Sequence, residues 1–142
     1  MKKNHIFAII SIVIFIISLF LPAVYIEKTR PISGGTCLLY GWLVSGNRGA
    51  WLANPLLFFS WFALLIKHPK VSAFLSFISL CIALNFLNEN LITIYEKGSS
   101  TEFTVNSYGL GYYFWVTSCF VILAGSLIFL KFKTNTSTEP SE

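Results

Sequence analysis

Four long apolar runs, separated by shorter polar segments, set the pattern of the chain. They cover residues 6–26, 49–66, 71–90 and 111–130. A helix needs about 20 apolar residues to cross a hydrocarbon core about 30 Å thick, and each run approaches or reaches that length. The pattern predicts an all-α membrane protein, a four-transmembrane-helix bundle in which residues 1–133 form one domain. The polar, non-periodic residues 134–142 are predicted to form a disordered cytoplasmic tail.

The first run has an alternative interpretation as a cleaved signal peptide, because Lys2 and Lys3 precede it. A signal peptide has a shorter apolar core and ends at a cleavage site made of small residues. The long core and the exit sequence Leu-Pro-Ala-Val-Tyr at residues 21–25 favour a helix that is retained.

The second run contains a proline close to its start. A helix that began at Pro55 would have twelve residues and a length of only about 18 Å. We therefore expect the helix to begin near Arg48 and to carry Pro55 in its second turn. Because proline has no backbone N–H, the carbonyl of Trp51 loses its helical partner, and a kink is expected there.

The two longer loops lie on the same predicted side of the membrane, which we call the outer side. In the first outer loop, the apolar residues 37–44 are too few to span, so they predict a short interfacial or re-entrant segment. In the second outer loop, residues 101–105 alternate between polar and apolar, which makes a short strand possible.

The basic residues are distributed unevenly between the two sides. One side holds Lys2, Lys3, Lys67, Lys70, Lys131 and Lys133, and the other holds Lys28, Arg30, Arg48 and Lys97. Short loops rich in lysine and arginine stay in the cytoplasm. The sequence therefore predicts a multi-pass protein of the plasma membrane with both termini in the cytoplasm.

Aromatic residues gather on the outer side, where all six tyrosines lie. Amphipathic aromatic side chains form belts at the level of lipid headgroups. The predicted outer aromatic belt comprises Trp42, Trp51, Tyr112, Tyr113 and Trp115.

Small residues form stripes at helical spacing and predict the faces on which helices pack, because small side chains let backbones approach closely in lipid. The clearest stripe is Ser72, Ser76, Ser79 and Ala83. Sparser stripes are Ala8, Ser11 and Ser18 in the first run, and Thr117, Ala124 and Gly125 in the fourth.

Four polar residues near the outer helix ends predict a small cluster beneath the aromatic belt. Asn85 and Glu89 are four residues apart and share a helical face, and Arg48 and Asn54 lie at the same level of the second helix. Ionisable groups in membranes are costly and often functional. Two readings stay open for Arg48, Asn54, Asn85 and Glu89: structural packing and a ligand site.

Composition narrows the possible functions. Hydrophobic residues make up 55% of the chain and charged residues 11%, against about 25% in soluble domains. The net charge of +4 is scattered, which argues against nucleic acid as a partner. The three cysteines form no C-x-x-C pair, and the only histidines are His5 and His68, so no metal or other cofactor and no catalytic residues are predicted.

Three short motifs at outer helix ends carry a resemblance. They are Trp-Leu-Ala-Asn-Pro at 51–55, Gly-Leu-Gly-Tyr-Tyr-Phe-Trp at 109–115 and Ser-Leu-Phe-Leu-Pro-Ala at 18–23. Together they resemble a family of small bacterial inner-membrane proteins of about this length. The resemblance implies a four-helix bundle in a bacterial inner membrane and supplies no activity.

These features favour a non-enzymatic interaction or accessory protein that acts through its outer face. Its expected partners are membrane lipid and either a membrane protein, such as a pore-forming toxin to which it confers immunity, or further copies of itself. The alternative is a subunit of a small-solute transporter or channel, which would have to oligomerise because few polar groups could line a path. A small membrane enzyme is disfavoured because no acid, base and thiol groups converge.

Overall fold

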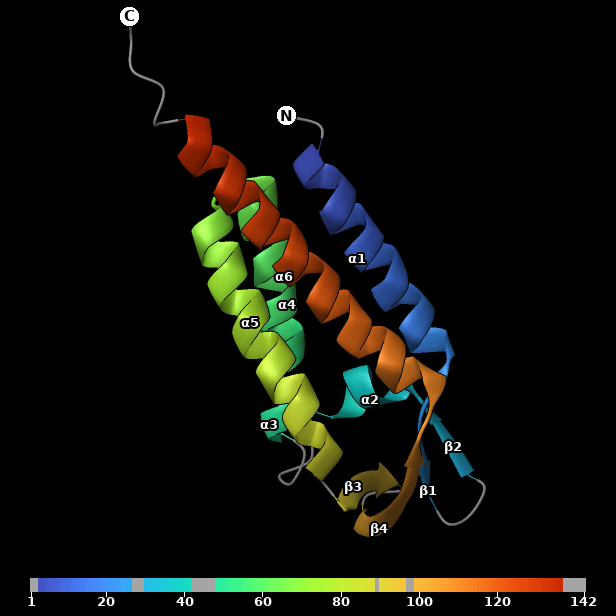
Figure 1. The fold of residues 1–142 in the computed structure, drawn as a ribbon. Coiled ribbons are helices and arrows are strands. Elements are labelled where there is room, and N and C mark those ends of the chain that lie inside the picture. The colour runs from blue at the N-terminus through green and yellow to red at the C-terminus, as the bar shows by residue number, and fades with distance from the viewer. Residues whose placement is uncertain (1–2, 27–29, 42–47, 89, 97–98, 137–142) are drawn as a thin grey trace, which may run out of the picture.

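The computed structural model describes residues 3–26, 30–41, 48–88, 90–96 and 99–136. Figure 1 shows long helices side by side, a small sheet at one end, and both chain termini at the other end. The long helices are α1 (Lys3–Phe20), α4 (Ala53–Leu65), α5 (Pro69–Asn85) and α6 (Leu110–Thr136). Shorter helical segments are α2 (Gly34–Tyr40), α3 (Arg48–Trp51) and the 3-10 turn η2 (Phe86–Asn88). The strands are β1 (Pro22–Ile26), β2 (Arg30–Ser33), β3 (Leu91–Glu96) and β4 (Ser99–Tyr108).

The predicted all-α four-transmembrane-helix bundle is wrong. The chain combines its helices with a four-stranded antiparallel sheet of order β2-β1-β4-β3. Within the described residues, only two helical segments are long and apolar enough to cross a membrane, Pro69–Asn88 and Leu110–Phe132. The apolar segments His5–Phe20 and Gly49–Leu65 are shorter, so the expectation of four crossings fails.

The end of the first apolar run is a strand rather than helix. Pro22 disfavours helical geometry at the residue before it, and α1 ends at Phe20. The next residues include the β-branched Val24 and Ile26, both fully buried in the sheet core. A fully buried strand is as uniformly apolar as a buried helix, so the hydrophobic run alone did not separate the two.

The second outer loop folds as a hairpin of β3 and β4. The strand that was possible at residues 101–105 lies within the longer strand β4. All six residues of β3 pair with β4 without a register shift, and β4 also pairs with β1. Cys37 of α2 and Phe86 of η2 pack on the sheet core, which joins the sheet to the helices.

The remaining helix ends follow from local chemistry. The segment that begins at Arg48 is interrupted at Leu52, between α3 and α4, and Pro55 leaves the carbonyl of Trp51 without its helical N–H.

Part of the predicted re-entrant segment forms α2, whose N-cap Ser33 accepts from the Thr36 N–H at 3.3 Å. The rest of that segment, at residues 42–44, lies outside the described residues. At the other end of the chain α6 continues to Thr136, so only residues 137–142 of the predicted tail lie outside the described residues.

The turn from α4 to α5 closes tightly. The His68 N–H donates to the Ala63 carbonyl at 2.8 Å, and the Lys67 N–H donates to the Leu64 carbonyl at 3.1 Å. This is the hydrogen-bond pattern of a Schellman cap, with Lys67 at a φ of 64° in the position that glycine usually takes. Pro69 then begins α5, where its missing N–H costs nothing.

The predicted small-residue stripe of α5 does face other helices. Ser72, Ser76, Ser79 and Ala83 are all buried. The Ser72 hydroxyl donates to the Ser60 carbonyl of α4 at 2.9 Å and lies 2.7 Å from the Ser126 hydroxyl of α6. One serine of α5 therefore links three helices.

The other two stripes agree in part. Ala8, Ser11 and Ser18 of α1 are buried, and Ser11 donates to the Ser118 carbonyl of α6 at 2.7 Å. In α6, Gly125 is buried beside Phe7, but Thr117 is exposed and donates to Tyr113 within its own helix. Ser118 and Ser126 of α6 do bond across helices, and the predicted stripe had missed both.

The turn between α1 and β1 fits against glycines that come from distant parts of the chain. A Cβ atom at Gly111 would lie 2.6 Å from the Leu21 carbonyl oxygen and 2.9 Å from that of Ser18. Gly34 approaches the same Ser18 carbonyl so closely that a side chain would collide with it. These backbone contacts fix where β1 leaves the helical body.

We expect Gly111→Ala to lower the free energy of unfolding by about 1–3 kcal/mol, because the added methyl group meets rigid backbone. Thermal unfolding in detergent measures the effect. Gly49→Ala is the matched control, since a Cβ at Gly49 has no neighbour within 4 Å and alanine favours the helix by about 0.5–1 kcal/mol. Equal effects of the two substitutions would contradict the close contact.

Candidate functional site

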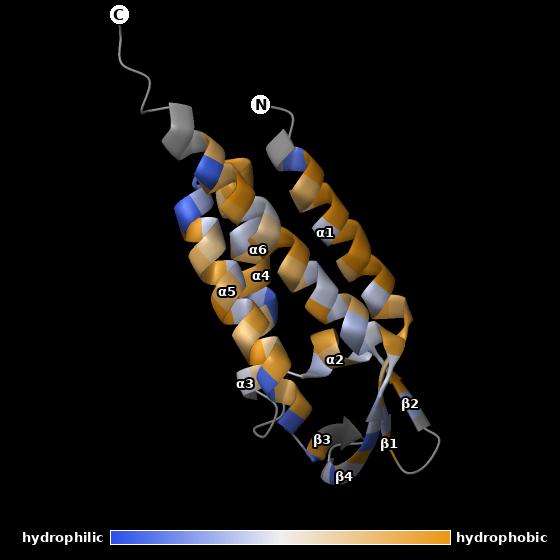
Figure 2. Cartoon of the chain, in the orientation of Figure 1, coloured by the Kyte–Doolittle hydropathy of each residue, from blue (hydrophilic) through white to orange (hydrophobic). Residues whose placement is uncertain are grey.

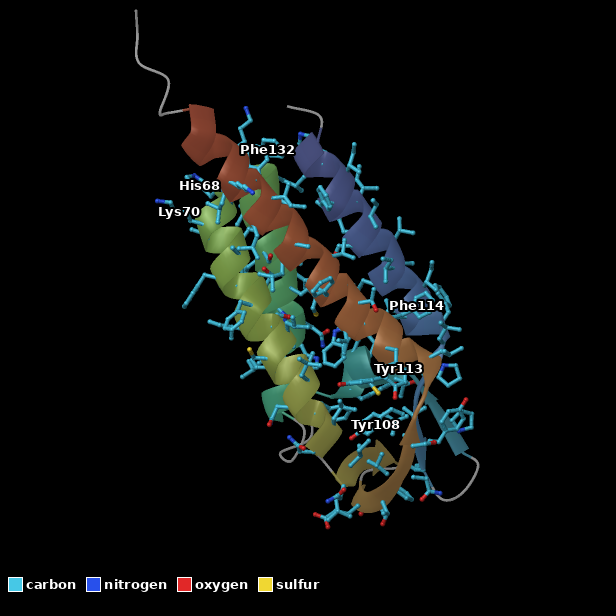
Figure 3. The ribbon with its side chains drawn as sticks, viewed as in Figure 1. His68, Lys70, Tyr108, Tyr113, Phe114 and Phe132 are labelled. Atoms are coloured by element: carbon cyan, nitrogen blue, oxygen red, sulfur yellow. The ribbon has the colours of Figure 1, made fainter. Side chains whose placement is uncertain are left out.

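The sheet end of the molecule carries most of the residues that the sequence singled out. Five aromatic rings meet where the helices join the sheet: Phe86, Tyr108, Tyr112, Tyr113 and Trp115. We call this group the aromatic seam. Its neighbouring ring centroids lie 4.9–6.1 Å apart. Figure 3 shows Tyr108 and Tyr113 at this end, with His68, Lys70 and Phe132 at the opposite end.

Two tyrosines of the aromatic seam satisfy the carboxyl end of α5. The last carbonyls of a helix have no partner within it, and an apolar environment makes an unpaired carbonyl costly. The Tyr112 hydroxyl donates to the Ala83 carbonyl at 2.8 Å, and the Tyr108 hydroxyl donates to the Phe86 carbonyl at 2.7 Å. These hydroxyls therefore attach the start of α6 and the end of β4 to the end of α5.

The predicted aromatic belt residues have different environments. Tyr112 is 2% exposed, whereas its neighbour Tyr113 is 53% exposed. Trp51 is partly buried, and its indole N–H donates to the Leu38 carbonyl of α2 at 2.8 Å. Trp115 is partly buried and packs on the helical core, and Trp42 lies outside the described residues.

Unlike the Tyr108, Tyr112 and Trp51 side chains, Trp115 has an indole N–H that donates to no described group. Its nitrogen is buried and has no hydrogen-bond partner within the part of the chain that the structure describes. A buried donor without an acceptor costs about 1–3 kcal/mol. Such a group is satisfied by a water molecule wherever the site is polar and large enough to hold one.

The predicted polar cluster is only partly placed. Asn54 is buried in α4, whereas Asn85 is exposed at the end of α5 and accepts from the Asn88 side-chain amide at 3.4 Å. Arg48 begins α3, and α3 contacts α5, but its side chain is outside the described part. Glu89 lies outside the described residues altogether. The place of Arg48 and Glu89 in the cluster therefore stays a prediction.

The polar interior of the helices is more extensive than the sequence predicted. Besides the Ser60, Ser72 and Ser126 contacts, the Trp61 indole donates to the Ser11 hydroxyl at 2.8 Å. The Ser79 hydroxyl donates to the Ala53 carbonyl at 2.8 Å. These hydroxyl groups bond to groups of the protein itself, which favours a role in packing over a path for solutes.

The chemistry of the titratable groups is limited. Within the described residues, no three or more His, Cys, Asp or Glu side chains come together as metal ligands would. Cys37, Cys81 and Cys119 are free thiols. Burial raises the pKa of Cys37, in α2, to about 11, so this thiol is protonated at neutral pH and is a weak nucleophile.

No protein-family model matches the sequence, and no curated protein or solved structure matches it. What the protein does is therefore inferred from its residues and their geometry.

We expect Tyr112→Phe to lower the free energy of unfolding by about 1–3 kcal/mol, because it removes the donor and leaves the Ala83 carbonyl buried and unpaired. Denaturation in detergent measures this. Tyr113→Phe removes a hydroxyl from an exposed ring and should change stability by less than about 0.5 kcal/mol. A neutral Tyr112→Phe would show that this hydroxyl does not support the end of α5.

Proposed function

We propose that this protein is an integral membrane protein that acts by binding another molecule at its sheet end rather than by catalysis. The observation that carries the proposal is the apolar outer surface of a helical body that buries many hydroxyl groups. The buried polar residues of the described chain are Ser11, Ser18, Asn54, Ser60, Ser72, Ser76, Ser79, Ser118 and Ser126. Many large apolar side chains face outward, and the Phe20 side chain, for example, is 82% exposed.

Exposed apolar side chains surround the long helices. Examples are Ile9 and Val13 on α1, Phe59 and Phe62 on α4, and Phe120 on α6. In Figure 2 apolar colour runs along the helices, and hydrophilic colour gathers near the two ends. Water-soluble monomers rarely expose apolar patches above a few hundred Å², so this surface is better suited to lipid.

Helix length supports the same placement. Pro69–Asn88 has 20 residues and Leu110–Phe132 has 23, which at 1.5 Å per residue gives about 30 and 35 Å. Both lengths match a hydrocarbon core of about 30 Å. In the proposed arrangement these two segments cross the bilayer, and the shorter helices α1 and α4 pack against α6 and α5 respectively.

The orientation follows from charge. Lys67, Lys70 and Lys131 are exposed at the end that holds the chain termini, and the acidic residue Glu102 is exposed at the sheet end. By the positive-inside rule, these lysines support an orientation with the lysine-bearing end in the cytoplasm and the sheet outside. In the bacterial inner membrane that the resemblance implies, the sheet would face the periplasm.

The sheet end has the chemistry of a binding surface. Thr101, Glu102, Thr104, Asn106 and Ser107 of β4 are exposed, and they supply hydroxyl, amide and carboxylate groups. A polar, hydrogen-bonding platform held outside the lipid supports recognition of a partner.

Cysteine labelling tests the orientation. In a variant whose native cysteines are serine, Glu102→Cys should react with a membrane-impermeant maleimide in intact cells. Lys70→Cys should react only after the membrane is permeabilised. The reverse labelling, or recovery of the protein in the soluble fraction after an alkaline wash, would overturn the membrane placement.

Photo-crosslinking tests the binding surface. A photoreactive residue in place of Thr104, on the exposed side of β4, should give a defined adduct that Glu102→Lys weakens at least threefold. The same group in place of Phe74, which is 65% exposed on α5, is the control and should label lipid. Adducts of equal yield from both positions, or none from Thr104, would contradict binding at the sheet.

A further inference from the structure

The two edges of the sheet differ in how well they are protected. The order β2-β1-β4-β3 leaves β2 and β3 at the edges, and no further strand of the described chain pairs with either. The strand β2 has four residues and contains Pro31, which has no N–H to offer a neighbouring strand. The strand β3, Leu-Ile-Thr-Ile-Tyr-Glu, is longer and has no proline, lysine or bulge. An edge strand without such protection offers its unpaired backbone N–H and C=O groups to another strand.

The hydrogen bonds of the hairpin decide which groups of β3 point outward. In an antiparallel pair, every second residue exchanges hydrogen bonds with the neighbouring strand. The Val105 N–H donates to the Asn90 carbonyl at 2.9 Å, so these two opposite residues form a hydrogen-bonded pair. Counting in steps of two from Asn90, the backbone groups of Ile92 and Ile94 also bond toward β4. The backbone groups of residues 91, 93 and 95 therefore face the open edge.

We propose that β3 pairs with β3 of a second copy of this chain, antiparallel, and joins the two sheets into one. A register that uses all three outward residues of both strands places Thr93 opposite Thr93 of the second copy. Leu91 then lies opposite Tyr95, and Ile92 lies opposite Ile94. A shift of the pairing by two residues in either direction would leave some of these outward backbone groups without a partner on the second strand.

The residues suit this register. Pairs of β-branched residues, and of aliphatic with aromatic residues, stabilise antiparallel strands, whereas like charges placed directly opposite destabilise them. Here Glu96 lies opposite Asn90 and not opposite a second Glu96. The only charged residue of β3 is therefore not repelled by its own copy.

The position of β3 is compatible with two copies in one membrane. Two identical antiparallel strands are related by a two-fold axis perpendicular to both. Figure 1 shows β3 lying across the direction of the helices, at the end away from the termini. Because β3 lies across the helices, an axis perpendicular to β3 can run parallel to the helices. A rotation about such an axis keeps both helical bodies in the same orientation.

Disulfide trapping in native membranes tests the register. With the native cysteines replaced by serine, Thr93→Cys should form a disulfide-linked dimer under a mild oxidant, because the paired Cα atoms would be about 5.5 Å apart. Thr104→Cys, in the inner strand β4, is the control and should give at least tenfold less. Leu91→Cys and Tyr95→Cys should each crosslink poorly alone and efficiently when both are present in one membrane.

A charge exchange separates loss of pairing from loss of folding. Thr93→Lys and Thr93→Glu should each reduce the dimer fraction at least tenfold, as measured by single-molecule photobleaching in vesicles. A mixture of the two variants should restore it, which unfolded protein could not do. Equal trapping at residues 93 and 104, a Thr93→Cys adduct with a different protein, or an unchanged dimer fraction in both charged variants would overturn the proposal.

Discussion

The helical body depends on hydroxyl groups that bond from one helix to the next. Where the surroundings of a helix are as apolar as its core, burial of apolar side chains gives helices little reason to associate, and close packing and polar contacts take over. Ser72 supplies both, because its small side chain allows α4 and α6 to approach α5 and its hydroxyl bonds to both. Ser11 does the same between α1 and α6, and Ser79 between α5 and α4.

In the aromatic seam, hydroxyl groups again bond from one element to another, here at the ends of the helices. The carbonyls at the end of α5 receive phenol hydroxyls from Tyr108 and Tyr112, which belong to the strand before α6 and to α6 itself. The same residues that complete a helix therefore also hold the sheet against it. The surface proposed for binding is thus attached rigidly to the part proposed to lie in lipid.

Sequence patterns predicted the helix-packing faces better than the architecture. The spacing of Ser72, Ser76 and Ser79 identified a buried face because that spacing reports directly on one side of a helix. The strand that contains Val24 and Ile26 was missed because a buried strand and a buried helix are equally apolar, and β1 depends on pairing with residues 105–108. The roles of Tyr108 and Tyr112 were also missed, since a belt at the headgroups and a helix cap use the same residue type.

The first and last thirds of the chain complete each other. The helix α1 packs on α6, β1 pairs with β4, and the Ser11 and Ser118 groups that meet are separated by 107 positions. During synthesis, α1 and β1 are therefore made before their partners. The edge of β1 that pairs with β4 and the side of α1 that carries Ser11 are uncovered until β4 and α6 follow. Contacts between such distant segments slow folding, because a long loop must close before they form. Until the last third of the chain is made, β1 lacks its partner β4. During this interval β1 is accessible to a chaperone or to an incorrect strand partner.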